Sequence, residues 1–363
     1  MKLQIQYKLF LYLLLIPCLA IANTGIDAKK VTKEKTIKKS FDVSSNATLK
    51  VNNSFGNLNI ITWDENRIEF DITIKVSGNN DEKVEERLEG IDVEFSASSS
   101  LVEAMTKIEK NKKNWWNWGN KAKLKMEIDY VIKMPMSNNV DLKNKFGAIN
   151  LDKLEGSANI RCDHGKITTK ELLSSNNEIK FNHTKNSYFD YIKDGKITAT
   201  HSDFTVAKVE NLELKADHTK SIIEYAEGVD FKCSFGSLKI DNVNDLGGKA
   251  QHLTARVGNL FKTANLNTSH GSLKISRIAS KANAVDIKSQ FTGITLGYDS
   301  TFNFNFKLDF QHGSLRDSEG FNFVNKEVNR NHKKYSGYHG SKDSGNTISI
   351  STQHGSVSFK KQS

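Results

Sequence analysis

Proline and cysteine are scarce in this chain, which has two prolines and three cysteines among its 363 residues. Because a proline removes a hydrogen-bond donor from a β-ladder, its scarcity suits a fold made of paired strands. No long hydrophobic run follows the first 22 residues, so the sequence predicts no transmembrane anchor. The sequence also lacks the nucleophile elbow, the metalloprotease helix and the phosphate-binding loop that mark common enzyme classes.

The first 22 residues have the pattern of a secretory signal peptide. Lys2 and Lys8 form a basic start, and the apolar run 9–22 ends in the small-residue pattern Ala-Ile-Ala. We expect cleavage before Asn23, and a lipoprotein anchor at Cys18 is the alternative. The mature chain is therefore expected to be exported, to the periplasm or the outer surface.

The net charge is positive. It is formally +10, and removing the two lysines of the signal segment leaves +8. The remaining lysines alternate with apolar residues along the expected strands and do not cluster. This pattern fits either a solvated exterior or attraction to anionic surfaces, and it does not resemble a nucleic-acid module.

A short sequence motif recurs along the chain and indicates a repeat architecture. It consists of Phe or His, followed by Gly in its strongest copies. From Phe146 to Phe291 the aromatic residue returns every 17 to 21 residues. Such a period is typical of stacked units that bury their apolar faces only against one another. We call the aromatic residue position zero, and its members are Phe55, Phe146, His164, His183, His201, His218, Phe235, His252, His270, Phe291, His312 and His354.

The residues around position zero predict two strands joined by a corner. Apolar side chains fall at −4, −2, 0, +3 and +5, and the change of phase after zero indicates a bend, where glycine at +1 would supply a left-handed or bulged backbone. A further short strand is expected to begin near +8. The predicted fold is all-β, a parallel β-helix or β-roll solenoid of about ten coils over residues 136–363, with the aromatic column inside. A polar loop insertion is expected at 325–346.

Residues 23–135 differ from the repeat and are expected to cap the solenoid. Runs 67–76 and 124–134 alternate apolar and polar residues, as strands do, and residues 81–89 have helix start and stop signals. The state of residues 100–110 stays open. This strand-helix-strand region would shield an exposed strand edge of the first coil.

The two cysteines that remain after cleavage, Cys162 and Cys233, both lie at position −2. They are four coils apart, or about 19 Å at about 4.8 Å per paired strand. A disulfide needs Cα atoms within about 7 Å. We therefore predict two buried free thiols.

Eight of the ten histidines occupy position zero. They could form a metal-binding ladder, but phenylalanine replaces histidine at four of the twelve positions, so we favour a stacked structural column without a metal or cofactor. Buried neighbouring imidazoles would stay neutral, so stability would fall between about pH 6 and pH 4. The pairs Asp217-His218 and Ser269-His270 are expected to face opposite sides of a strand and to form no catalytic relay.

One segment has the composition of a binding surface. Trp115, Trp116 and Trp118 lie next to Lys112 and Lys113. Exposed indoles beside basic groups suit sugar stacking, a membrane interface or a protein partner. The alternative is that the indoles fold back and plug the end of the core.

Four features together carry a family resemblance: Trp63-Asp64, the helix near 81–89, the run Tyr130-Val-Ile-Lys-Met-Pro135 and the glycine-aromatic coils. With them the chain resembles the bacterial putative-adhesin family, a β-helical domain of unknown function similar to the head domains of putative autotransporter adhesins. The resemblance covers about residues 45–360 and implies a β-helical fold without catalytic residues. The histidines at position zero and the tryptophan-rich insertion depart from the family pattern.

The sequence therefore predicts an exported, non-enzymatic binding or scaffold module of the bacterial cell envelope, a putative adhesin. A rigid rod would present its Lys, Asn and Ser side chains, and the tryptophan segment, to an envelope or extracellular glycan or protein. Two alternatives stay open. One is a β-helical carbohydrate-active enzyme, and the other is an accessory or sensor protein of an envelope stress system.

Overall fold

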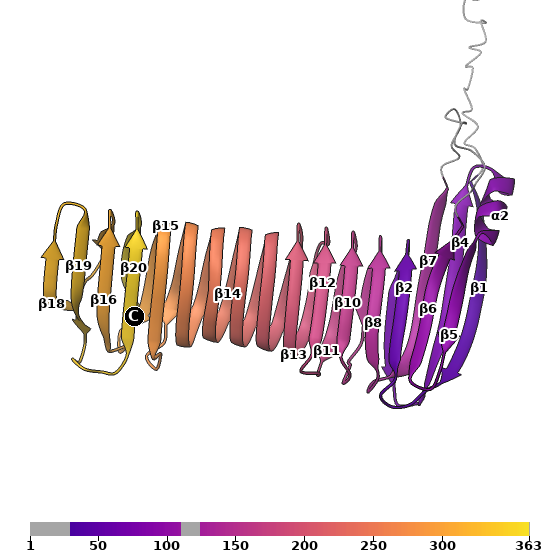
Figure 1. Cartoon of the computed structure of the whole chain (residues 1–363), viewed down its shortest axis with the longest axis horizontal. Coiled ribbons are helices and arrows are strands. Elements are labelled where there is room, and N and C mark those ends of the chain that lie inside the picture. Colours follow the sequence, from indigo (N-terminus) through magenta and orange to yellow (C-terminus); the bar gives the residue numbers. More distant parts are fainter. Residues whose placement is uncertain (1–29, 110–123, 363) are drawn as a thin grey trace, which may run out of the picture.

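In the computed structural model the chain is wound into coils stacked in a row (Figure 1). The structure describes residues 30–109 and 124–362. Within them the fold is all-β apart from α2 (Asp81–Glu89), and most strand pairs are parallel. Among the described residues, no helix is long and apolar enough to cross a membrane.

Each coil contributes two strands that meet at a corner. In one coil β8 (Asn139–Lys145) leads into β9 (Ala148–Leu151), and in the next β10 (Ala158–Asp163) leads into β11 (Lys166–Leu172). β8 pairs with β10 and β9 with β11, both in parallel. The row continues through β12 (Asn177–Asn182), β13 (Ser187–Thr200), β14 (Asp203–Ile278), which alone makes several coils, and β15 (Ala284–Asp299) (Figure 1).

The core is the inside of the coils. Around Phe146 the residues at −4, −2, +3 and +5 are Leu142, Asn144, Ile149 and Leu151, and all four are at most 4% exposed. The residues expected to lead a further strand at +8, such as Leu172 and Val243, are fully buried as well. The inward positions were therefore predicted correctly, with the exception of position zero.

The first coil is followed, at the N-terminal end of the row, by parallel neighbours and then by antiparallel strands. The coil of β2 (Thr48–Ser54) and β3 (Leu58–Trp63) pairs on one side with β8 and β9, and on the other with β6 (Leu101–Ile108) and β7 (Lys125–Pro135). β5 (Ile91–Ala97) then pairs antiparallel with β6. β4 (Arg67–Gly78) pairs antiparallel with β7, and β1 (Val31–Asp42) with β4.

The helix that follows β4 was predicted with its caps. The Asn80 side chain accepts a hydrogen bond from the Lys83 amide at 2.8 Å, and the Gly90 amide donates to the Glu86 carbonyl. Val84 and Leu88 are buried against the strands. Residues 101–108, which the sequence left open, form strand β6 because their alternating apolar side chains pack beside β2.

At the other end the coils do not follow the order of the sequence. β20 (Thr347–Gln353) and β21 (Ser356–Gln362) lie between β15 and the earlier coil of β16 (Phe304–Gln311) and β17 (Ser314–Arg316). The antiparallel hairpin of β18 (Phe321–Val328) and β19 (His332–His339) covers β16. The loop insertion expected at 325–346 is therefore wrong over most of its length, because Tyr335 and Phe323 pack this hairpin against the core.

Candidate functional site

Position zero lies on the outside of the coils, which corrects the expectation of an inward column. Phe146, Phe235 and Phe291 are 43–46% exposed. Neighbouring rings stack with centroids 4.8–5.3 Å apart and planes within 24° of one another. The column also departs from sequence order, since His354 stacks between Phe291 and His312.

A left-handed backbone turns these rings outward. All twelve residues at position zero have φ between 47° and 65°, whereas the alternation of a continuous strand would have pointed them inward. The corner glycine is needed for space and not for a left-handed backbone. A Cβ at Gly147 would overlap the carbonyl oxygen of Gly56 in the adjacent coil. Glycine at this corner therefore permits the close approach of the two coils, and the aromatic residue takes the left-handed conformation.

The outward column removes the basis for two expectations. Loss of stability below pH 6 rested on buried imidazoles, and these rings are exposed. The pairs expected to face opposite sides are in contact, with His218 Nδ1 3.0 Å from Asp217 Oδ2 and Ser269 Oγ 2.8 Å from His270 Nδ1. In the described part of the chain, no group of three or more His, Cys, Asp or Glu side chains is arranged to hold a metal ion.

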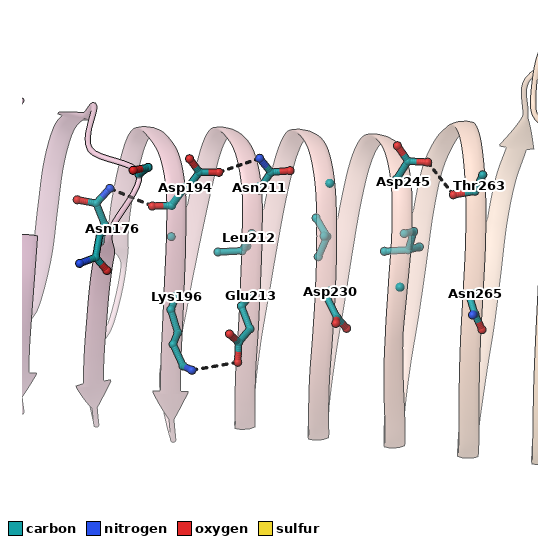
Figure 2. A pocket seen from close by; sticks show the side chains of 17 residues that line it. Asn176, Asp194, Lys196, Asn211, Leu212, Glu213, Asp230, Asp245, Thr263 and Asn265 are labelled. Atoms are coloured by element: carbon teal, nitrogen blue, oxygen red, sulfur yellow. Dashed lines mark hydrogen bonds and ion pairs between the residues drawn. The ribbon is translucent and has the colours of Figure 1, made fainter. Parts of the chain in front are cut away.

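A shallow groove crosses the coils of β13 and β14 (Figure 2). It encloses about 640 Å³, and we call it the acidic groove. Leu212, Val229 and Leu246, each 3% exposed, lie between two outward rows of residues. One row is Asp194, Asn211, Gly228, Asp245 and Thr263, and the other is Lys196, Glu213, Asp230, Gly247 and Asn265.

Hydrogen bonds and missing side chains shape this groove. Asn211 Nδ2 donates to Asp194 Oδ1 at 2.7 Å, and Thr263 Oγ1 donates to Asp245 Oδ1 at 2.6 Å, so two pairs of neighbouring coils are joined within one row (Figure 2). Gly247 leaves a gap in the other row, where an added Cβ would meet the Asp230 carboxylate only at 3.8 Å. This groove was not predicted from the sequence, in which its one signal is a glycine at an outward strand position.

The charge of the groove is opposite to that of the chain. Four carboxylates, from Asp194, Glu213, Asp230 and Asp245, line it together with the ammonium group of Lys196. Lys196 pairs with Glu213 at 3.2 Å, which leaves a formal local charge of −3. Such a surface attracts cationic groups and offers acceptors to hydroxyl donors.

A second polar network stands on the same coils. Tyr191 Oη donates to Glu210 at 2.7 Å, and Tyr225 Oη donates to Glu227 at 2.6 Å. The bond to Glu210 is the main cause that raises the pKa of Tyr191 to about 12, and the bond from Tyr225 is the main cause that lowers the pKa of Glu227. Lys208 Nζ lies 5.8 and 6.0 Å from the two tyrosine rings, so cation–π contacts join the two pairs. The network holds these surface side chains in fixed positions.

The structure tests some of the remaining predicted residues. Cys162 and Cys233 are free and buried, as predicted, and burial is the main cause that raises the pKa of both thiols to about 12. Trp115, Trp116, Trp118, Lys112 and Lys113 lie outside the described residues, as does the expected signal peptide at 1–22.

Comparisons with known proteins give likenesses of structure. No family model matches the chain, and no curated protein matches it. Solved structures of bacterial putative adhesins are similar over about 90% of the chain. A putative cell adhesion protein from Clostridium sporogenes has 13% identity, covers 91% of this chain and 100% of its own, and has a TM-score of 0.18. A putative adhesin from Parabacteroides merdae has 9% identity, coverages of 90% and 96% and a TM-score of 0.29. A putative lipid binding protein from Parabacteroides distasonis has 10% identity, coverages of 90% and 96% and a TM-score of 0.21. The function of this chain is therefore inferred from its own residues.

Proposed function

We propose that this chain is an exported, non-enzymatic binding module of the bacterial cell envelope, built as a parallel β-solenoid that displays ligand sites along its side. The observation that carries the proposal is the acidic groove, which runs across coils and not along one strand. Its partner is an extended glycan or protein segment that follows the axis of the row. Export rests on the signal pattern at residues 1–22.

The rigidity of the groove supports binding. Both outward rows stand on strands that are paired on both sides, so their side chains are held at intervals of about 4.8 Å. The hydrogen bonds Asn211–Asp194 and Thr263–Asp245 fix several of them before any ligand arrives. Preorganised polar groups lose less conformational entropy on binding, and this favours recognition of a repetitive ligand.

A carbohydrate-active enzyme of β-helical type is the second candidate, because the groove holds carboxylates. Asp230 and Asp245 stand in opposite rows of adjacent coils, and glycosidases cleave a glycosidic bond between two carboxyl groups. Polysaccharide turnover that disappears in both Asp230→Asn and Asp245→Asn variants would favour the enzyme over the binding module.

The test is binding of the chain without residues 1–22 to a panel of envelope glycans and to whole cells. A Gly247→Leu variant fills the gap in the acidic groove, and Gly293→Leu is its matched control, because an added Cβ there meets no atom within 4 Å. Loss of binding in Gly247→Leu alone would support the acidic groove. If the two variants bind equally well, the acidic groove is excluded as the binding site.

The tryptophan segment enters the same test. A variant with Trp115, Trp116 and Trp118 changed to Ala should retain binding if the acidic groove is the site. Circular dichroism of each variant controls for folding. Loss of binding in this variant only would move the site to residues 110–123.

A further inference from the structure

A second hollow lies near the C-terminal end of the row, where β20 is inserted between β15 and β16. It encloses about 640 Å³. Strands β14, β15, β20 and β16 form its floor, and two residues of the β18–β19 hairpin, Asn331 in its turn and His332 in β19, form a wall. We call it the amide groove after the glutamines that it contains. It is complete only when β20 occupies its place.

A hydrogen-bonded row of glutamines runs across this floor. Gln290 Nε2 donates to Gln353 Oε1 at 3.1 Å, and Gln353 Nε2 donates to Gln311 Oε1 at 2.7 Å. Each primary amide has two N–H donors and an oxygen that accepts two hydrogen bonds. The row therefore fixes the amide orientations and keeps further donors and acceptors for a ligand.

A hydrogen bond holds the wall of the amide groove in place, and the groove carries no net formal charge. His332 Nε2 lies 2.6 Å from Asp309 Oδ1, which ties the hairpin to the floor. Lys288 supplies one ammonium group and Asp309 one carboxylate, so these two formal charges cancel. This balance contrasts with the local charge of −3 in the acidic groove.

The aromatic column borders the amide groove. Gln290, Gln353 and Gln311 directly precede the column members Phe291, His354 and His312. Those three rings stack at 4.8 Å intervals, and Phe291 is 46% exposed. Amide groups that can bond several hydroxyls thus stand next to an apolar aromatic edge.

We propose that the amide groove binds a neutral oligosaccharide. The sugar hydroxyls exchange hydrogen bonds with the glutamine row, and an apolar C–H face of the sugar packs on the edge of the column at Phe291. A peptide added as a strand does not fit, because β20 and β16 are each paired on both sides. This site is separate from the acidic groove, so the two proposals stand or fall independently.

The experiment is calorimetric titration of the chain without residues 1–22 with neutral gluco- and xylo-oligosaccharides, with oligogalacturonate and with chitosan oligomers. We expect binding of a neutral oligosaccharide, and weaker binding or none of the two charged ones. Gln353→Leu breaks both bonds of the glutamine row and should weaken neutral-sugar binding at least tenfold. Gln251→Leu, which also directly precedes a column member but lies outside both grooves, should leave that binding unchanged.

Three results would overturn the inference: no heat with any neutral oligosaccharide, a preference for a charged one, or full affinity in Gln353→Leu. Binding that is lost in Gly247→Leu and kept in Gln353→Leu would refute the amide groove and support the acidic groove. If Gln353→Leu does not fold, the exposed Gln290→Ala decides in its place, with the same tenfold criterion.

Discussion

Replacement of Phe235 by alanine and by glycine separates the two opposing energies of the aromatic column. The Phe235 ring stacks on His218 at 4.8 Å and on His252 at 4.9 Å, while its backbone is left-handed at φ 49°. Each aromatic contact is worth about 0.5–1.5 kcal/mol beyond buried area, so the two together contribute about 1–3 kcal/mol. A left-handed conformation costs a non-glycine residue about 1–2 kcal/mol.

Alanine loses the stacking and keeps the strain, so Phe235→Ala should lower the free energy of unfolding by about 1–3 kcal/mol. Glycine also loses the stacking but relieves the strain. The greater freedom of glycine in the unfolded chain offsets about 0.4–1 kcal/mol of that relief. Phe235→Gly should therefore be more stable than Phe235→Ala by about 0.5–1 kcal/mol.

Urea unfolding followed by circular dichroism measures the three free energies, and Phe235→His serves as a control that keeps an aromatic ring in the column. The control should resemble the unmodified chain, because histidine already occupies eight of the twelve positions. An alanine variant as stable as the glycine variant would refute the claim that the left-handed backbone at position 235 is strained. An alanine variant as stable as the unmodified chain would refute stacking as a source of stability.

Three further predictions concern the thiols, the corner glycines and the inserted strands. Cys162 and Cys233 should resist a thiol reagent at pH 8 until the chain unfolds, since burial raises both pKa values to about 12. Because these exceed the unfolded value of about 8.5, the stability that the thiols contribute is complete below pH 8.5 and falls as the pH rises towards 12, by about 2 kcal/mol each at pH 10. Urea unfolding of the Cys162→Ala/Cys233→Ala variant should show a shallower decline over this range, and an equal decline would contradict the assignment. Gly147→Ala should lower the melting temperature strongly and Gly293→Ala hardly at all, because only the first added Cβ overlaps a neighbouring coil. Removal of residues 346–363 takes away four buried apolar side chains worth about 1.5–3 kcal/mol each, so size-exclusion chromatography should show aggregation, and a monodisperse product would argue against the insertion.

The inward face of the coils could be predicted because it follows local periodicity. Residues such as Leu142 and Ile149 alternate with polar neighbours, and one face of a strand must be buried. The helix at 81–89 was equally accessible, because Asn80 and Gly90 are local signals at its two ends.

The aromatic column was placed on the wrong side because a single left-handed residue reverses the alternation. Continued alternation from Cys162 points His164 inward, and only its φ of 53° turns it out. The frequency of histidine at position zero was a usable signal, since histidine is less often fully buried than phenylalanine. Position zero thus shows that hydrophobicity alone does not give the direction of a side chain at a corner.

The order of the last coils could not be predicted from local pattern. The interval of 42 residues between His312 and His354 indicates an insertion, but it does not distinguish a loop from a pair of strands. Which strand lies beside β15 depends on pairing between residues far apart in the chain, and both β16 and β20 carry the alternation that such pairing needs. The amide groove was missed for the same reason, since Gln353 lies between Gln290 and Gln311 only in the folded arrangement.

The interposed position of β20 also sets an order of events for a chain that is made from its N-terminus. Synthesis delivers β16 before β20, although β20 separates β16 from β15 in the finished structure. If β16 pairs with β15 first, that contact must open again before β20 can enter. Until then the exposed strand edges can capture other chains, so the slowest and most aggregation-sensitive step of folding should lie at this end of the row.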